Sequence, residues 1–429
     1  MTDKATKTTK PIRIAILLGA PFTEQNYERV GIPYLSPHFE VRVFDCLNWL
    51  GRNADEIKCK RVHWQHFMAI STELDLDEAM RAFKPGFAID AIGFGAFTAK
   101  IQEILSKHDV KFVVPIAAAL PTPSFANRIR NFIVSKSVQV RDSHAPSNFE
   151  NIEVVRQSKA GIFFTKLFGK LKQIIIIRKN ISPPDISLLA GDCSLDFYTK
   201  RSPKLFWIGS HDFHQFKKTK RDMEANKKIW VEGEFLLFID DAIPKANDWA
   251  LLNMKPPIVE AEYYSMLRSF FERAELYYGL PVVIAGHPNS KSDDSYLSNM
   301  GGRTVVFGET AALALQSTLV LIHGSTAVSF AVLARKPTLF FTSRELDELA
   351  YGAHIRTMAK SLGRPLVFMD DMGNYELKSY PLEIDEKRYK LYETNYLRSA
   401  LSREDWPWQA FIDFVNSTSK VDAHPTEIR

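Results

Sequence analysis

The feature of this 429-residue chain that most constrains its fold is a series of short apolar runs that alternate with segments of helical periodicity. Residues 12–19 and 319–322 are such runs, and each is followed by glycine or by polar residues. Apolar runs of this length predict strands that are buried on both faces, as in a parallel sheet. Segments such as 97–107, where apolar residues recur every three or four positions, supply the crossover helices that parallel strands need. The sequence therefore predicts an α/β fold with doubly wound parallel sheets.

The alternating pattern occurs twice along the chain, and the length fits two domains. Strands are predicted at 12–19, 39–45, 87–92, 110–115 and 205–209, and again at 235–239, 281–286, 304–307, 319–322 and 337–341. Helices are predicted at 257–278, 310–316 and 327–334. We expect a disordered N-terminus (1–10), an N-terminal domain (11–212), a basic linker (213–228), a second domain (229–388) and C-terminal helices with a tail (389–429).

Composition excludes several classes of protein. Hydrophobic residues make up 45% of the chain and charged residues 24%, which is typical of globular proteins. The formal charge of +5 is too small to indicate a nucleic-acid partner. Three cysteines, Cys46, Cys59 and Cys193, without a CxxC pair argue against a disulfide scaffold. The N-terminus lacks the apolar core of a signal peptide, and no apolar run approaches the roughly 18–20 residues that span a bilayer. We therefore expect a cytoplasmic protein.

Two polar motifs directly follow predicted strands of the second domain. His287-Pro288 follows 281–286, and Gly324-Ser325-Thr326 follows 319–322. Imidazole, hydroxyl and backbone N–H groups at such positions bind phosphate without a metal ion. Lys291 adds a positive charge close to the first motif. The sequence therefore predicts a site for the phosphate of a nucleotide sugar, although Ser325 or Thr326 could instead serve only as a helix cap.

Carboxylates at strand ends are the candidates for a general base. Asp240-Asp241 follows the predicted strand 235–239, and crowding of two carboxylates raises the pKa of one of them. Glu24 is the first alternative, because it follows the turn at Gly19, itself a predicted donor-binding position. Asp90 and Asp45 are further alternatives in the N-terminal half.

With these motifs the sequence resembles the GT-B glycosyltransferases of bacterial surface-polysaccharide assembly, in particular the sialyl-, polysialyl-, nonulosonate and Kdo transferases that use CMP-sugar donors. The likeness covers residues 232–343 and rests on the HP motif at His287-Pro288 and the Ser/Thr motif at Ser325-Thr326. In that family both motifs contact the donor phosphate. The family's acidic motif, D/E-D/E-G, supplies the base, and its counterpart here is Asp240-Asp241-Ala242, with alanine in place of glycine.

The resemblance implies two Rossmann-like domains that face a cleft, and a metal-independent transfer of an acidic sugar. The donor would be a CMP-activated nonulosonate, such as sialic, pseudaminic or legionaminic acid, or Kdo. The acceptor would be a capsule, lipopolysaccharide or other glycan, including a lipid-linked saccharide at the inner face of the membrane. The basic, aromatic segment 163–172 is amphipathic and would suit such a peripheral membrane contact, although a core-facing helix is the plainer interpretation.

Three alternatives remain open on the sequence. One is a UDP-sugar hexosyltransferase, and another is an enzyme resembling UDP-N-acetylglucosamine 2-epimerase, which has a similar two-domain architecture. The third is a polysaccharide-binding subunit without turnover, which the alanine at position 242 keeps in consideration.

No metal or redox cofactor is expected. The pairs His211/His214 and His63/His66 have a spacing that suits one helix face, but neither has a full set of further ligands nearby. Gly93-Phe94-Gly95 lacks the third glycine of a dinucleotide-binding fingerprint, so the sequence does not favour NAD.

Overall fold

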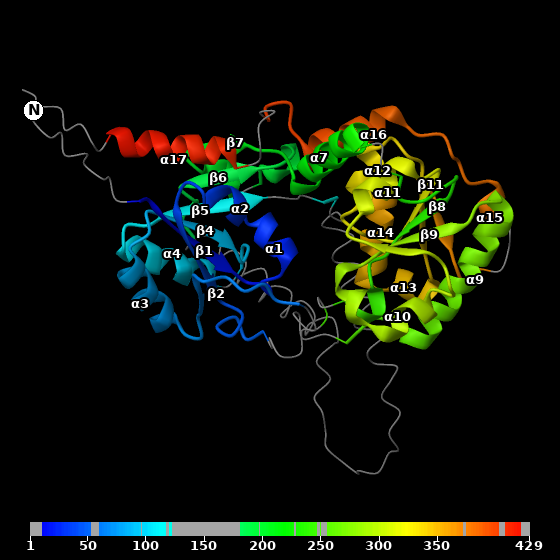
Figure 1. Cartoon of the computed structure of the whole chain (residues 1–429), viewed down its shortest axis with the longest axis horizontal. Helices are drawn as coiled ribbons and strands as arrows, with labels where there is room; N and C mark the ends of the chain where they lie inside the picture. Colours follow the sequence, from blue (N-terminus) through cyan, green and yellow to red (C-terminus); the bar gives the residue numbers. More distant parts are fainter. Residues whose placement is uncertain are drawn as a thin grey trace, which may run out of the picture.

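The computed structural model describes residues 11–52, 60–95, 97–116, 120–121, 181–196, 198–226, 229–246, 249, 255–371, 375–402 and 408–421. These residues form two α/β units, each built on one parallel sheet (Figure 1). The two-domain, doubly wound α/β fold predicted from the sequence is therefore confirmed.

The first sheet has the strand order β3-β2-β1-β4-β5-β6-β7 in the described part of the chain. Its strands are β1 (Arg13–Leu18), β2 (Glu40–Asp45), β3 (Phe67–Ala69), β4 (Phe87–Ala91), β5 (Lys111–Ile116), β6 (Ile186–Leu189) and β7 (Lys204–Trp207). Its helices are α1 (Glu24–Arg29), α2 (Ile32–Leu35), α3 (Glu73–Phe83) and α4 (Thr98–Lys107). Strands β3-β2-β1-β4-β5 follow the order of a Rossmann domain, in which the strand order reverses between the first and fourth strands.

The second sheet has the order β10-β9-β8-β11-β12-β13, which is the complete Rossmann order of six strands. Its strands are β8 (Leu236–Ile239), β9 (Val282–Gly286), β10 (Val305–Phe307), β11 (Leu319–Ile322), β12 (Thr338–Thr342) and β13 (Leu366–Phe368). Its longer helices are α9 (Glu260–Tyr278) and α14 (Ala350–Ser361), and its shorter ones are α10 (Asp294–Asn299), α11 (Thr310–Gln316), α12 (Val328–Leu333), α13 (Arg344–Glu348), α15 (Tyr375–Lys378) and α16 (Glu386–Tyr392).

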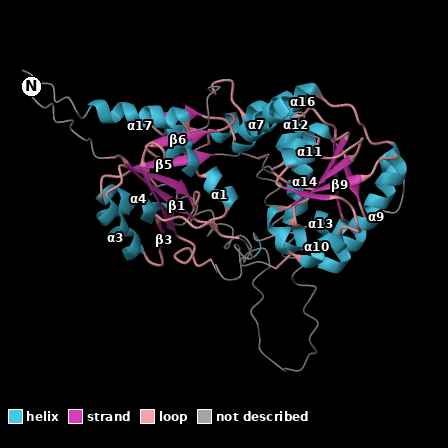
Figure 2. Ribbon diagram, in the orientation of Figure 1, coloured by secondary structure: helices cyan, strands magenta, loops and turns pink. Residues whose placement is uncertain are grey.

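Helices cover both faces of each sheet, so the central strands are enclosed (Figure 2). All four residues of β8 are buried, as the run of apolar residues predicts. On one face of this sheet α9 packs with Phe270, whose ring stacks on that of Phe341 in β12 at 4.3 Å. Burial of a large aromatic core on both faces holds the strand ends in fixed positions.

The described part of the chain crosses between the two units twice. It first passes from β7 into α7 (His211–Asn226), which packs against α11 and α12 of the second unit. It returns through α16 and a π-helix (Glu393–Leu397) to α17 (Gln409–Val421), which lies on the first unit (Figure 1). Phe411 of α17 packs edge-on against Phe87 of β4. The predicted C-terminal helical tail is present.

Some elements differ from the sequence analysis. Within the segment 213–228, predicted as a basic linker, residues 213–226 belong to helix α7, which is anchored by buried Phe213 and Phe216. The short strand β3 was not predicted, since its three residues are exposed at the sheet edge and show no buried pattern. Strands β6 and β13 and helix α3 were also not predicted. Segment 163–172 and Cys59 lie outside the described residues.

No helix among the described residues has both the length and the apolar character that crossing a membrane requires.

Candidate functional site

The predicted motifs of the second domain meet at the carboxyl ends of three neighbouring strands. β8 lies between β9 and β11, and Ile239 at its end pairs with Ala285 on one side and Ile322 on the other. The loops that carry Asp240, His287 and Gly324 therefore start at the same level of the sheet. The sheet order reverses between β8 and β11, which is where ligands bind in open α/β folds.

Asp240 connects the loop after β8 to the loop after β9. The residue is 3% exposed, its Oδ2 accepts a hydrogen bond from the Tyr296 hydroxyl (2.6 Å), and its Oδ1 accepts one from the Ala242 N–H (2.9 Å). The backbone N–H of His287 also donates to this carboxylate. Burial raises the pKa of Asp240, and these three donors oppose the rise.

Asp241 connects the loop after β8 to the loop after β11. Its Oδ2 accepts hydrogen bonds from the Gly324 N–H (2.9 Å) and from the Tyr351 hydroxyl of α14 (2.6 Å). Burial of the carboxyl group raises its pKa, and the neighbouring Asp240 adds to the rise. The two carboxylates thus fix both candidate phosphate-binding loops against the central strand.

Ala242 occupies a backbone conformation that favours glycine. Its φ of 49° lies in the left-handed region, which costs about 1 kcal/mol for a residue with a β-carbon. A glycine would adopt this conformation without that cost.

The loop after β9 carries His287 and Lys291. His287 is half-buried, whereas Pro288 and Lys291 are exposed on a 3₁₀ turn (Pro288–Ser292). A β-carbon on Gly286 would lie 2.5 Å from the ring of Phe307, so the glycine permits β10 to approach. β10 therefore packs closely behind this loop, and His287 lies at the carboxyl end of β9.

In the loop after β11, the backbone of Gly324 is already engaged by protein groups. Its N–H donates to Asp241, and its carbonyl oxygen lies 3.0 Å from Nε2 of His354. Ser325 is half-buried and Thr326 is exposed. Helix α12 has only six residues, so any dipole contribution is small and the two hydroxyl groups are the candidate phosphate ligands of this loop.

His323, which precedes this loop, has a structural role that the sequence did not reveal. The side chain is fully buried, with Nδ1 2.7 Å from the carbonyl oxygen of Phe341 and Nε2 3.1 Å from the Tyr263 hydroxyl. Since a carbonyl only accepts, Nδ1 carries the proton and the tyrosine donates to Nε2. Burial lowers the pKa of His323 to about 4, so the ring is neutral near pH 7.

The predicted residues of the first domain lie at the carboxyl end of its own sheet. Gly19 is buried after β1, and its carbonyl accepts a hydrogen bond from Arg52. Glu24 is exposed in the first turn of α1.

Asp90 of β4 is buried where the strand order of the first sheet reverses. Its Oδ1 accepts hydrogen bonds from the N–H groups of Ile92 (2.9 Å) and Gly93 (3.4 Å). Burial raises the pKa of Asp90 to about 6. Asp45, at the end of β2, is also buried, and burial raises its pKa.

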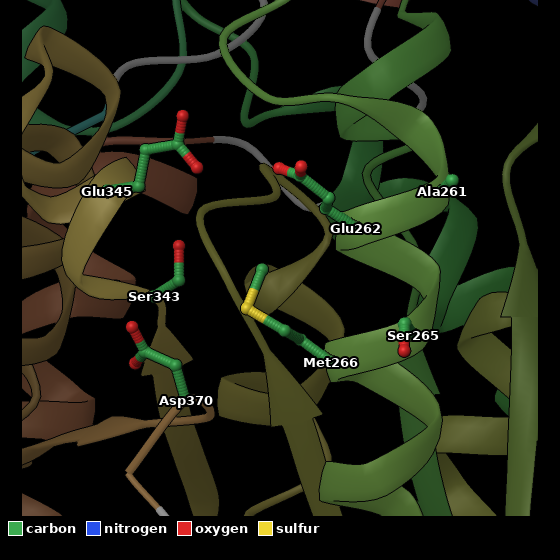
Figure 3. A pocket seen from close by; sticks show the side chains of 7 residues that line it. All are labelled: Ala261, Glu262, Ser265, Met266, Ser343, Glu345 and Asp370. Atoms are coloured by element: carbon green, nitrogen blue, oxygen red, sulfur yellow. The ribbon is translucent and has the colours of Figure 1, made fainter.

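In the second domain, a cavity of about 500 Å³ opens between the first turns of α9 and the ends of β12 and β13 (Figure 3). Its lining includes Glu262, Glu345 and Asp370. Burial and the charge of Glu262 raise the pKa of Glu345. Because three carboxylates line the cavity, it does not suit a phosphate group.

Within the described ranges, no three His, Cys, Asp or Glu side chains are placed to hold a metal ion together. His214, one of the histidines weighed as a ligand, instead lies with Nε2 2.6 Å from the carbonyl oxygen of Ile208.

No protein-family model matches the chain, and no curated protein is similar enough in sequence to count as a match. Similar solved structures include the wall teichoic acid polymerase TagF, at 10% identity and a TM-score of 0.49 over 96% of this chain and 90% of that one. They also include UDP-GlcNAc 2-epimerase from Methanocaldococcus jannaschii (10%, 0.42, over 89% and 99%) and the glycotransferase of kitacinnamycin (9%, 0.46, over 95% and 99%). Likenesses at this level of identity and TM-score describe shape and say nothing of activity.

Proposed function

We propose that the chain is a glycosyltransferase that binds the phosphate of a nucleotide-sugar donor at the loops after β9, β8 and β11. The observation that carries this proposal is the convergence of two motifs on the central strand. His287 lies on one side of β8, and Ser325 and Thr326 lie on the other, with Asp240 and Asp241 fixing both loops.

The groups available at this edge suit stabilisation of a leaving phosphate. His287 can donate from its ring, Thr326 can donate from its hydroxyl, and Lys291 carries a positive charge nearby. The Ser325 hydroxyl is hydrogen-bonded to Asp241 and would turn to the phosphate when it binds. Fixed donors aimed at a developing charge are effective because they need no reorganisation during the reaction. No divalent metal ion is needed for this arrangement.

A carboxylate would then remove the proton of the acceptor hydroxyl, which attacks the anomeric carbon as the bond to the phosphate breaks. Asp241 is our first candidate and Asp240 the second, because burial raises the pKa of both carboxyl groups and makes them better proton acceptors. Glu24 and Asp90 of the first domain are the alternatives.

For the donor we favour a CMP-activated acidic sugar, a nonulosonate or Kdo, on the strength of the HP and Ser/Thr motifs, with a surface glycan as the acceptor. A UDP-sugar hexosyltransferase or an epimerase would use the same phosphate site, and a binding subunit would use it without turnover. These alternatives predict different nucleotides and different products.

The test is calorimetric titration of the purified chain with CMP, CDP, UDP, GDP and NAD, with and without a chelator. We expect CMP to bind most tightly, with the same affinity in the presence of chelator. His287→Ala should weaken nucleotide binding about tenfold and lower transfer about 100-fold, as loss of one charge-stabilising donor does in other enzymes.

The exposed His38→Ala is the matched control and should leave both quantities unchanged. Preference for UDP would overturn the CMP assignment, and unaltered binding and transfer in His287→Ala would overturn the phosphate site. Nucleotide binding without transfer or donor hydrolysis would point to the binding subunit.

A further inference from the structure

The first turn of α7 lies where the chain passes from the first domain to the second. Its N-terminal residue follows Ser210, whose N–H donates to the carbonyl oxygen of Leu397 in the π-helix (2.7 Å). The same helix packs against α11 and α12 of the second domain. The start of α7 therefore lies on the first passage of the chain between the domains and contacts the return passage at the π-helix.

Asp212, in that turn, is connected to the candidate phosphate-binding loop through one hydroxyl group. Ser329 of α12 donates a hydrogen bond from Oγ to Oδ2 of Asp212, and its backbone N–H donates to the carbonyl oxygen of Thr326 (3.2 Å). A single serine thus stands between the Asp212 carboxylate and the residues that open α12.

On its other side Asp212 is influenced by the first domain. Glu28 and Arg29, at the end of α1, act on His211 through their charges, and Arg29 also lowers the pKa of Asp212. Burial raises the pKa of Asp212, while Ser329, His211 and Arg29 oppose that rise. The charge of Arg29 thus influences the pKa of Asp212, while Ser329 of α12 is hydrogen-bonded to its carboxylate.

We propose that Asp212 is a positioning residue that couples the loop at Ser325 and Thr326 to the contact between the two domains. The carboxylate accepts the hydrogen bond of the Ser329 hydroxyl, and Ser329 holds the first turn of α12 through its backbone N–H. The turn of α7 that carries the carboxylate follows Ser210, which is hydrogen-bonded to Leu397 on the return passage of the chain. A shift of this passage then reaches the phosphate-binding loop through a short chain of polar contacts. This role rests on the phosphate site proposed above.

The test compares Asp212→Ala, Asp212→Asn and Ser329→Ala in two measurements: affinity for the nucleotide that wild-type protein binds, and amide hydrogen exchange at residues 324–330 without nucleotide. We expect Asp212→Ala and Ser329→Ala to weaken binding about tenfold, within the usual range of coupling between sites, and to speed exchange in this loop. Asp212→Asn keeps an oxygen that accepts from Ser329, so it should recover most of the exchange protection.

Two controls match these changes. Asp222→Asn removes an exposed carboxylate from the same helix, and Ser317→Ala removes a buried hydroxyl that donates to Ala314 at the opposite end of β11. Both should leave binding and exchange at 324–330 within twofold of wild type. Unchanged exchange and affinity in a folded Asp212→Ala protein would overturn the proposal.

Arg29→Ala removes an exposed side chain and tests whether its charge, which influences Asp212, contributes to the coupling. We expect Arg29→Ala to have no further effect on exchange at residues 324–330 in the Ser329→Ala background, because both substitutions act through Asp212. Additive effects of the two substitutions would contradict it. Absence of any nucleotide binding by wild-type protein would refute the phosphate site, whereas the exchange experiments would still decide the coupling.

Discussion

Asp241 has two features that make its role testable with single substitutions. Its carboxylate braces a loop by accepting from Gly324 and Tyr351, and burial raises its pKa, as suits a base. Asp241→Asn keeps an acceptor oxygen but cannot take a proton. We therefore expect sugar transfer to fall about 100-fold, within the range for general bases, while nucleotide affinity changes less than threefold. Steady-state kinetics with calorimetry measures both quantities.

Tyr351→Phe provides the comparison, because it removes one hydrogen bond to Asp241 and keeps the carboxylate. A base role requires Tyr351→Phe to retain much more transfer than Asp241→Asn. Equal losses in the two variants would assign Asp241 to bracing alone, and unchanged transfer in Asp241→Asn would move the base to Glu24 or Asp90.

Asp90 predicts a distinct pH dependence of stability. The folded protein holds the Asp90 proton up to pH about 6, whereas the usual pKa is near 3.8. The stabilisation that protonated Asp90 contributes to the folded state is therefore fully present below pH 3.8. It is lost as the pH rises through 6, which lowers the free energy of unfolding by about 3 kcal/mol. Asp90→Asn cannot ionise and keeps the oxygen that accepts from Ile92. Between pH 3.5 and pH 7, its free energy of unfolding should rise by about that amount relative to wild type.

Urea unfolding followed by tryptophan fluorescence at several pH values measures this difference. The exposed Asp222→Asn should give a difference that stays constant with pH. A constant difference for Asp90→Asn as well would show that burial of Asp90 does not perturb its titration.

At the scale of elements, α7 depends on one cap at the passage between the domains. The Ser210 side chain is buried and its Oγ accepts from the Phe213 N–H (3.1 Å), one of the four N–H groups that a helix start leaves without a partner in the helix. Ser210→Ala should lower the free energy of unfolding by about 1 kcal/mol, and Ser210→Thr should restore most of it. Urea unfolding measures both values. Equal stability of Ser210→Ala and wild type would show that another group satisfies this N–H.

At the scale of the whole molecule, α17 joins the C-terminal end of the described chain to the first domain. Trp408 is 3% exposed and covers Gly31, where a β-carbon would lie 2.2 Å from the indole ring. Trp408→Ala should cost about 3–5 kcal/mol, the usual penalty for removing a large buried side chain. We expect amide exchange to accelerate in β1, β2 and β4 and to stay unchanged in β8, β9 and β11.

Leu401→Ala is the control, because that side chain is 70% exposed and precedes α17 in the sequence. It should leave exchange in both sheets as in wild type. Equal acceleration in the two sheets of Trp408→Ala would instead mean that the domains unfold as one unit.

Local sequence alone determined most strands of the two sheets and the position of the candidate site. Runs such as 235–239 and 319–322 are apolar throughout because the strands are covered on both faces. Consecutive apolar residues in the sequence therefore predict a buried strand. The motifs that follow them, at Asp240, His287 and Gly324, could be placed at one strand edge because parallel strands share a direction. Strand β3 escaped prediction because an exposed three-residue edge strand carries no such pattern.

Only the tertiary structure decided what these residues contact. Asp240 and Asp241 take their partners from Tyr296 and Tyr351, 56 and 110 positions away in the chain, and no local pattern encodes such pairs. The burial that makes His323 neutral and raises the pKa of Asp90 likewise depends on side chains from several elements. The packing of α17 on the first domain also depends on residues that are distant in the chain. Apolar periodicity shows that a helix has a face to bury, but the surface that covers it is chosen only when the whole chain has packed.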